Sequence, residues 1–231
     1  MTAEAQVGFR DRLGAHLRGS RIVAGLELLV VPLLLGLQTA AVMAKPKLPL
    51  LLFGWLSLWL RRVGWRRVGL SRPTSWPKTL LAASLIGLAY NAFDIGVILP
   101  LLRRATGEPL DLTQLGELKG NLGMLGLLVA VSWLSAAFPE ELLYRGYILN
   151  RLTDVLGRTT AGWAVAAALV SVAFGLAHGA QGVTGVLDNV LAGVLFVVLY
   201  LTSGRNLWMP ILAHGMIDTS SVVMLYLGFQ P

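Results

Sequence analysis

The chain has 231 residues, of which 55% are hydrophobic and only 13% charged, and its mean hydropathy is +0.69. A soluble domain carries about 25% charged residues, so this composition excludes an ordinary soluble protein and indicates an integral protein of the lipid bilayer. The formal net charge of +7 then indicates basic loops that orient a membrane protein, and no nucleic-acid partner is expected.

Residues 1–21 form a basic, polar segment with arginines at Arg10, Arg12, Arg18 and Arg21. The segment is too polar for the apolar region of a secretory signal, so we expect no cleaved signal peptide. It is predicted to be cytoplasmic, either as a short basic helix on the membrane surface or as a frayed tail. Residues 22–231 are predicted to form a single membrane-embedded domain, because no repeat or low-complexity linker divides them.

Apolar runs in this domain predict an all-α fold, a polytopic transmembrane helix bundle of about seven (six to eight) spans. The second run is short for a bilayer and fits a re-entrant segment equally well. In chain order, the candidate spans are 22–43, 48–60, 80–102, 121–156, 161–177, 183–201 and 207–227.

Lysine and arginine are distributed unevenly around these spans. If the N-terminus is inside and all seven runs cross, fourteen of the nineteen Lys and Arg residues fall inside and five outside. The most basic segment is the loop at 61–78. The distribution favours a multi-pass protein of the cell membrane with a cytoplasmic N-terminus.

A charged stretch at residues 138–145 follows an uncharged run, and it contains Glu140, Glu141 and Arg145. Placing one charged residue in a bilayer costs about 2.5–3.5 kcal/mol even on lenient scales. Three charged residues beside an apolar run therefore indicate a structural or functional role. On a helix Glu141 and Arg145 share a face and are predicted to pair. Glu140 points about 100° away and is predicted to do the chemistry. The alternative is a solvated helix end at the cytoplasmic surface.

Two histidines are the next candidates. His178 follows Phe174 by one helical turn, and His214 shares a helix face with Asp218. The alternatives are a solvated helix cap for His178 and a structural hydrogen-bonded pair for His214 with Asp218. Three further polar residues in the runs are better explained as hydrogen bonding between helices, namely Asp94, Asp188 and Asn189.

Carboxylate and imidazole groups on three separate spans can converge in a bundle. A Glu or a neutral His can act as general base on a water molecule. The chain has no cysteine and no Gly-x-Ser-x-Gly run, which excludes a thiol nucleophile and weakens a serine mechanism. The residues therefore favour a hydrolase that acts through an activated water.

These residues also carry a family resemblance. The chain contains, in order, the motifs Glu140-Glu141-x-x-x-Arg145, Phe174-x-x-x-His178 and His214-x-x-x-Asp218, with flanking segments at 65–73, 144–148 and 202–208. Over roughly residues 60–226 it resembles the CAAX-protease and bacteriocin-processing family, the Ras-converting-enzyme type of intramembrane endopeptidase, also called the abortive-infection family.

The resemblance implies a role for each matching residue. Glu140 and His178 would activate the hydrolytic water, while His214 and Asp218 would stabilise the oxyanion. Glu141 and Arg145 would orient the site by pairing. The family's best-studied members have Asn where this chain has Asp218, and an ionised Asp repels an oxyanion, so Asp218 would be protonated or would orient His214.

The resemblance also implies a membrane-associated peptide or protein as substrate, without naming it or showing that it is prenylated. No metal is expected, because the chain lacks a His-Glu-x-x-His helix. The alternative is a zinc site formed by Glu140, His178, His214 and Asp218. A non-catalytic scaffold or immunity protein of the same fold is the alternative function, and a transporter is a weaker one because the halves show no symmetry.

One expectation conflicts with a working site. If Arg151 and Thr159 mark the cytoplasmic surface, Glu140 lies about 16 Å deep and His178 about 28 Å deep at about 1.5 Å per residue. Straight, upright helices would then hold the two side chains about 12 Å apart in depth. A kink at Pro139, tilted helices or different boundaries would be needed to bring them together.

Overall fold

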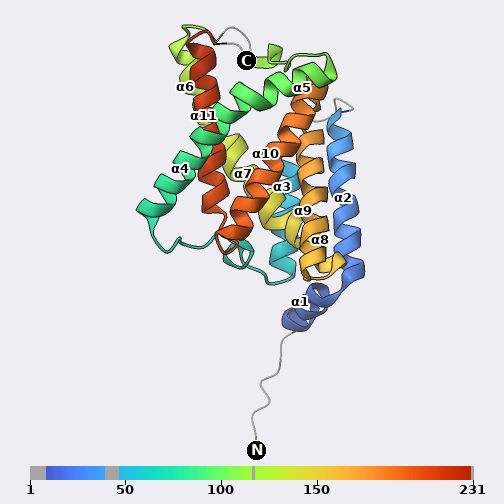
Figure 1. The fold of residues 1–231 in the computed structure, drawn as a ribbon. Coiled ribbons are helices and arrows are strands. Elements are labelled where there is room, and N and C mark those ends of the chain that lie inside the picture. The colour runs from blue at the N-terminus through green and yellow to red at the C-terminus, as the bar shows by residue number, and fades with distance from the viewer. Residues whose placement is uncertain (1–8, 40–46, 116–117, 230–231) are drawn as a thin grey trace, which may run out of the picture.

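The computed structural model describes residues 9–39, 47–115 and 118–229, and within these ranges the chain consists of helices joined by turns and loops, with no strand. Figure 1 shows a bundle with α1 at one end and the C-terminal end of α11 at the other. The α-helices are α1 (Phe9–Gly19), α2 (Arg21–Thr39), α3 (Lys47–Leu60), α4 (Trp76–Phe93), α5 (Leu99–Thr106), α6 (Leu122–Val131), α7 (Phe138–Glu141), α8 (Leu149–Leu156), α9 (Thr160–Leu176), α10 (Gly182–Thr202) and α11 (Trp208–Tyr226).

Short helical segments of other types connect or interrupt these helices. Three are 3₁₀ turns: η1 (Trp65–Val68), η3 (Thr113–Leu115) and η6 (Gly179–Gln181). Three are π-helical: η2 (Asp94–Ile98), η4 (Ser132–Ala137) and η5 (Leu142–Ile148). The π-helical segments lie inside long continuous helices, so the helix Trp76–Thr106 contains η2, and the helix Leu122–Leu156 contains η4 and η5.

Pro139 lies in the first turn of α7, directly after the π-helical segment η4. A proline inside a regular α-helix lacks an N–H and clashes with the carbonyl one turn earlier. A wider turn before the proline changes the hydrogen-bond register, and such π-bulges are frequent at functional sites. The helix therefore continues through Pro139 into the charged stretch.

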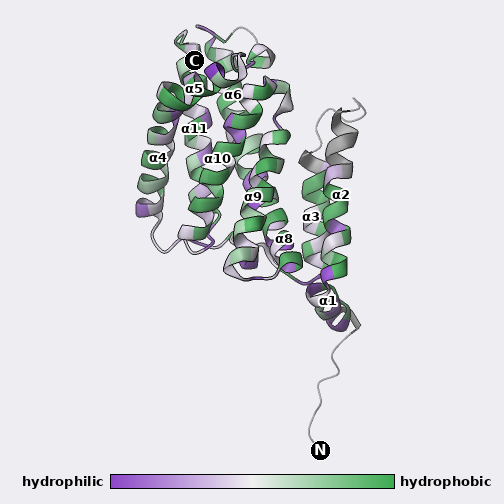
Figure 2. Ribbon diagram, turned by 45° about the vertical axis from the view of Figure 1, so that its right-hand side comes forward, coloured by the Kyte–Doolittle hydropathy of each residue, from purple (hydrophilic) through white to green (hydrophobic). Residues whose placement is uncertain are grey.

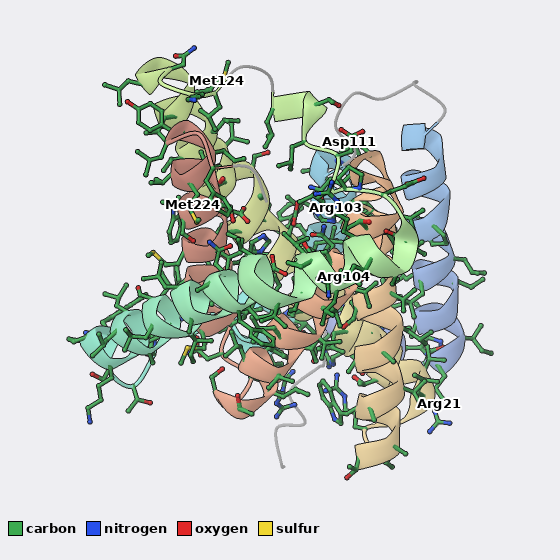
Figure 3. The ribbon with its side chains drawn as sticks, turned by 45° about the horizontal axis from the view of Figure 1, so that its top comes forward. Arg21, Arg103, Arg104, Asp111, Met124 and Met224 are labelled. Carbon is green, nitrogen blue, oxygen red and sulfur yellow. The ribbon has the colours of Figure 1, made fainter. Side chains whose placement is uncertain are left out.

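Three helices of the described chain are long and apolar enough to cross a membrane: Trp76–Thr106, Leu122–Leu156 and Gly179–Thr202. Figure 2 shows hydrophobic residues along the helices of the bundle and hydrophilic residues concentrated in α1. Figure 3 places Arg103 and Arg104 at the end of the bundle away from Arg21. The chain is therefore an all-helical membrane protein, as its composition indicates, and the number of about seven spans stays a prediction.

The predicted elements match the observed helices closely. The basic N-terminal segment forms α1, with residues 1–8 outside the described range, and the first predicted span corresponds to α2 as far as Thr39. The largest shift is at α4, which begins at Trp76 instead of residue 80. Its start is favoured by an extended N-cap at Ser75 and a proline in the first turn, where a missing N–H costs nothing.

Glycines bring the helices that carry the site into close contact. A methyl group on Gly175 of α9 would collide with Val186 and Val190 of α10. On the same pair of helices, a Cβ on Gly193 of α10 would lie 3.1 Å from the backbone of Ser171. Small residues let membrane helices approach closely enough for dispersion contacts, which drive association where the hydrophobic effect does not. The α9–α10 contact is therefore built on glycine.

Two loops are joined at the end of the bundle that carries α1. Leu207 N donates to Gly69 O over 2.9 Å, and Asn206 Nδ2 donates to Ser71 O over 3.1 Å. Gly69 has φ +115°, and a side chain there would collide with the Arg205 carbonyl. The basic loop after α3 is thus held against the loop between α10 and α11.

The close α9–α10 contact predicts that Gly175→Ala destabilises the protein by about 1–3 kcal/mol, because overpacking forces the helices apart. Thermal unfolding in detergent would measure the effect. The matched control is Gly126→Ala on α6, where an added methyl meets nothing within 4 Å. Equal melting temperatures for the two variants would contradict the proposed contact.

Candidate active site

An ion pair between Glu141 and Arg145 lies at the centre of the bundle. Arg145 Nη1 lies 2.9 Å from Glu141 Oε1, and both side chains are fully buried. Arg145 Nη2 donates to the Gly193 carbonyl of α10 over 3.0 Å. The guanidinium carbon lies 4.6 Å from the centroid of the Phe174 ring and 5.0 Å from that of Phe196. The pair predicted from helix spacing is therefore present, and the aromatic rings of Phe174 and Phe196 lie close to its guanidinium cation.

His214 of α11 joins this pair through the same carboxylate. Its Nδ1 lies 3.0 Å from Glu141 Oε1, the oxygen that also accepts from Arg145. The Phe196 ring stacks on the imidazole with centroids 4.5 Å apart and planes at 17°. Glu141 therefore sets the orientation of His214, and Phe196 packs against its face.

The other nitrogen of His214 faces two further carboxylates. Nε2 lies 3.6 Å from Asp218 Oδ2 and 3.9 Å from Glu140 Oε2. Only 4% of the Glu140 side chain is exposed, compared with 27% of the Asp218 side chain. Three predicted site residues, Glu140, Glu141 and Asp218, thus surround the imidazole of a fourth, His214. Asp218 lies on the more accessible side of the ring.

His178 lies just after α9 and is half-buried. Its Nδ1 lies 2.8 Å from the Phe174 carbonyl. Because a carbonyl can only accept, Nδ1 is the donor, and in the neutral ring Nε2 is then the basic nitrogen. The Phe174 ring contacts both histidine rings, with centroids 4.8 Å from His178 and 6.0 Å from His214. Phe174 therefore connects His178 to the buried group.

The expected depth mismatch between Glu140 and His178 is not observed, because Arg151 does not mark the membrane boundary. Arg151 is fully buried, and its helix continues to Leu156. Counted from the helix ends, Glu140 lies about 24 Å in and His178 about 27 Å, at about 1.5 Å per residue. Tyr144, one turn after Glu140, packs edge-on against Phe174 at 5.1 Å, so the two turns lie at one level.

A buried ionic network behind the site was not predicted from the sequence. Glu27 of α2 accepts hydrogen bonds from Arg151 Nε (2.8 Å), Tyr147 Oη (2.9 Å) and Ser57 Oγ (2.6 Å). It thereby connects α2 and α3 to the helix that carries Glu140. The available signal was an acidic residue inside an apolar run, which requires a partner.

Other polar residues of the spans connect helices, with one exception. Asn189, expected to bond between helices, instead donates to Gly185 O (2.8 Å) and Gln181 Oε1 (2.7 Å) within its own helix. The carboxyl groups of Asp94 in η2 and Asp188 in α10 interact with one another.

Asn91 of α4 donates to Ser220 Oγ over 2.8 Å and accepts from Ser221 Oγ over 2.8 Å. Ser220 and Ser221 therefore pair with an amide, which gives neither hydroxyl a base to activate it.

Within the described part of the chain, no group of three or more His, Cys, Asp or Glu side chains has a geometry that could hold a metal ion.

The buried pair predicts that Glu141→Gln and Arg145→Ala each destabilise the protein by about 3–5 kcal/mol, because each leaves an uncompensated buried charge. Thermal unfolding in detergent would measure the loss. Asp11→Asn serves as the control, because Asp11 and Arg62 form an ion pair with both side chains about half exposed. If all three variants melted alike, Glu141 and Arg145 would not form a structural pair.

Comparison with known proteins supports the resemblance seen in the motifs. No curated protein and no solved structure matches the chain. The family model described as type II CAAX prenyl endopeptidase, Rce1-like, matches residues 123–220, a segment that includes every candidate site residue. The resemblance to the CAAX-protease family is thereby confirmed, and over residues 123–220 this chain is similar to the Rce1-like type II CAAX prenyl endopeptidases.

Proposed function

We propose that this protein is an intramembrane endopeptidase that hydrolyses a peptide bond of a membrane-associated protein or peptide. The observation that carries the proposal is the buried carboxylate of Glu140, 3.9 Å from His214 Nε2, within the segment that matches the endopeptidase family. A buried carboxyl group beside an oriented imidazole is suited to proton transfer. The ion pair of Glu141 and Arg145 connects the helices without Glu140, so Glu140 is not required for that structural role.

In the proposed reaction, Glu140 and His178 hold and deprotonate a water molecule. The water oxygen attacks the carbonyl carbon, and His214 donates a hydrogen bond that stabilises the negative charge developing on the carbonyl oxygen. The proton then passes to the leaving nitrogen as the peptide bond breaks, which releases a carboxylate and an amine. A donor aimed at such an oxyanion contributes about 2.7–4 kcal/mol to the transition state.

Asp218 is assigned an orienting role in this scheme. Its carboxylate lies 3.6 Å from His214 Nε2, on the opposite side of the ring from the Glu141 contact to Nδ1. A protonated His214 is a donor at both nitrogens, so carboxylates at both can hold it as the donor that an oxyanion requires. An ionised Asp218 then need not contact the oxyanion itself.

We further propose a cell-membrane location with about seven spans and a cytoplasmic N-terminus. The three long apolar helices support membrane insertion, and the excess of Lys and Arg on the N-terminal side supports the orientation. The bilayer would deliver the substrate laterally to the site.

The first test is cleavage of membrane-anchored peptides by purified protein in liposomes. Glu140→Gln and His178→Ala are each expected to lower the cleavage rate by about 10²-fold or more while the protein stays folded, since general acid–base groups contribute about 10²–10⁴-fold. The control is Glu108→Gln, a glutamate at an exposed position in the loop after α5. Full activity of Glu140→Gln would exclude the mechanism. Absence of cleavage by every protein, wild type included, would instead favour a non-catalytic scaffold.

Removal of metal ions is expected to leave cleavage unchanged. The same assay would be run with and without a chelator, followed by elemental analysis of the purified protein. Loss of cleavage with the chelator and its recovery on adding zinc would instead support a zinc site of Glu140, His178, His214 and Asp218.

A further inference from the structure

A cavity of about 300 Å³ lies at the end of the bundle that carries α1. Five arginines from four segments of the chain line it, together with one acidic residue, Asp154. The arginines are Arg18 of α1, Arg61 after α3, Arg67 of η1, Arg158 between α8 and α9, and Arg205 between α10 and α11. Segments far apart in the sequence therefore direct the same cationic group to one place.

The positive charge around the cavity is not balanced by the carboxylates near it. Asp154 is shared among Arg158 (2.8 Å), Arg151 (3.0 Å) and Arg61 (3.8 Å), and Glu27 is bound to Arg151. Counting Arg151, six arginines face these two carboxylates, which leaves four positive charges. Arg151 is fully buried, and its Nη2 has no hydrogen-bond partner in the described part of the chain.

Contacts with the rest of the fold position three of these arginines, Arg61, Arg158 and Arg205. Arg61 is 5% exposed and its Nε donates to Ser57, while the 3.8 Å separation of its Nη1 from Asp154 is longer than a hydrogen bond. The guanidinium carbons of Arg158 and Arg205 each lie 5.7 Å from the centroid of the Trp163 ring. Arg205 also has φ +61°, a strained conformation for a residue other than glycine, maintained by the contact between the two loops.

A general bias toward basic residues at the cytoplasmic end explains how many arginines are found there. It does not explain why five of them converge on one cavity or why Arg61 is buried. Guanidinium groups present paired donors that match the oxygens of phosphate, and clusters of arginine are the usual recognition element for that anion. The cavity volume lies at the lower end of the range for small-ligand sites, about 300–1,000 Å³.

We propose that this cavity binds a phosphate group, supplied either by the headgroup of an anionic phospholipid or by a soluble phosphate. Anionic lipids are concentrated in the cytoplasmic leaflet, at the end where the arginines are predicted to lie. The cavity uses neither Glu140 nor His178, so the proposal is independent of the proposed proteolysis.

The test uses the full-length protein in nanodiscs with two neighbouring arginines of η1 as a matched pair. Both are exposed, but Arg67 is among the residues that line the cavity and Arg66 is not. In one arm, protein in phosphatidylcholine nanodiscs is titrated with inorganic phosphate by calorimetry. In the other, phosphatidylglycerol is added to the nanodiscs, and native mass spectrometry measures the lipid retained per protein.

Wild type is expected to bind one phosphate group saturably in one of the arms, and the arm identifies the source. Arg67→Gln is expected to weaken binding about tenfold, the value of one charge-assisted hydrogen bond, while Arg66→Gln binds as wild type does. Arg158→Gln provides a second cavity variant, and thermal unfolding verifies that each variant is folded. Absence of binding in both arms, or an equal effect of Arg66→Gln and Arg67→Gln, would overturn the proposal.

Discussion

The arrangement of the site depends on one carboxylate oxygen, Oε1 of Glu141. It accepts from Arg145 on its own helix at 2.9 Å and lies 3.0 Å from Nδ1 of His214 on α11. Arg145 in turn donates to the Gly193 carbonyl of α10. Three helices are therefore connected through two charged side chains that have no contact with solvent. Because desolvating such charges is costly, the arrangement is stable only while each group keeps its partners.

This requirement accounts for the residues around the pair. Gly193 lets α9 pack closely against α10, and the carbonyl of Gly193 itself accepts from Arg145. Gly215 of α11 also lies close to its neighbour, since a Cβ there would collide with the Trp133 ring. Phe174 and Phe196 cover the guanidinium and also contact the His214 ring. Aromatic rings exclude water without removing hydrogen-bond partners, and their faces attract a cation. The packing that stabilises the pair is thus the same packing that orients the imidazole.

Charged groups occur in this bundle in two settings with different consequences. Inside the bundle, Arg145 pairs with Glu141 and Arg151 pairs with Glu27. Charged groups at the end that carries α1 are numerous and mostly arginine, and they converge on a cavity with Asp154 as the acidic residue in its lining. A matched ion pair needs no ligand to balance its charge, whereas unbalanced arginines create a local positive potential that attracts an anion.

The sequence by itself determined what depends on local periodicity. Composition established a helical membrane protein, the apolar runs located the helices to within a few residues, and four-residue spacing identified the pairs Glu141–Arg145 and His214–Asp218. The tertiary structure alone decided that Glu141 binds His214, 73 residues away, and that Glu27 binds Arg151, 124 residues away. It also showed that Arg151 is buried, which removed the expected difference in depth between Glu140 and His178. A 3.6-residue period specifies which side chains share a face of one helix. It does not specify which other helix packs against that face or how far that helix is shifted along the axis. Those features depend on side-chain volumes and glycine contacts, which follow no periodic pattern in the sequence.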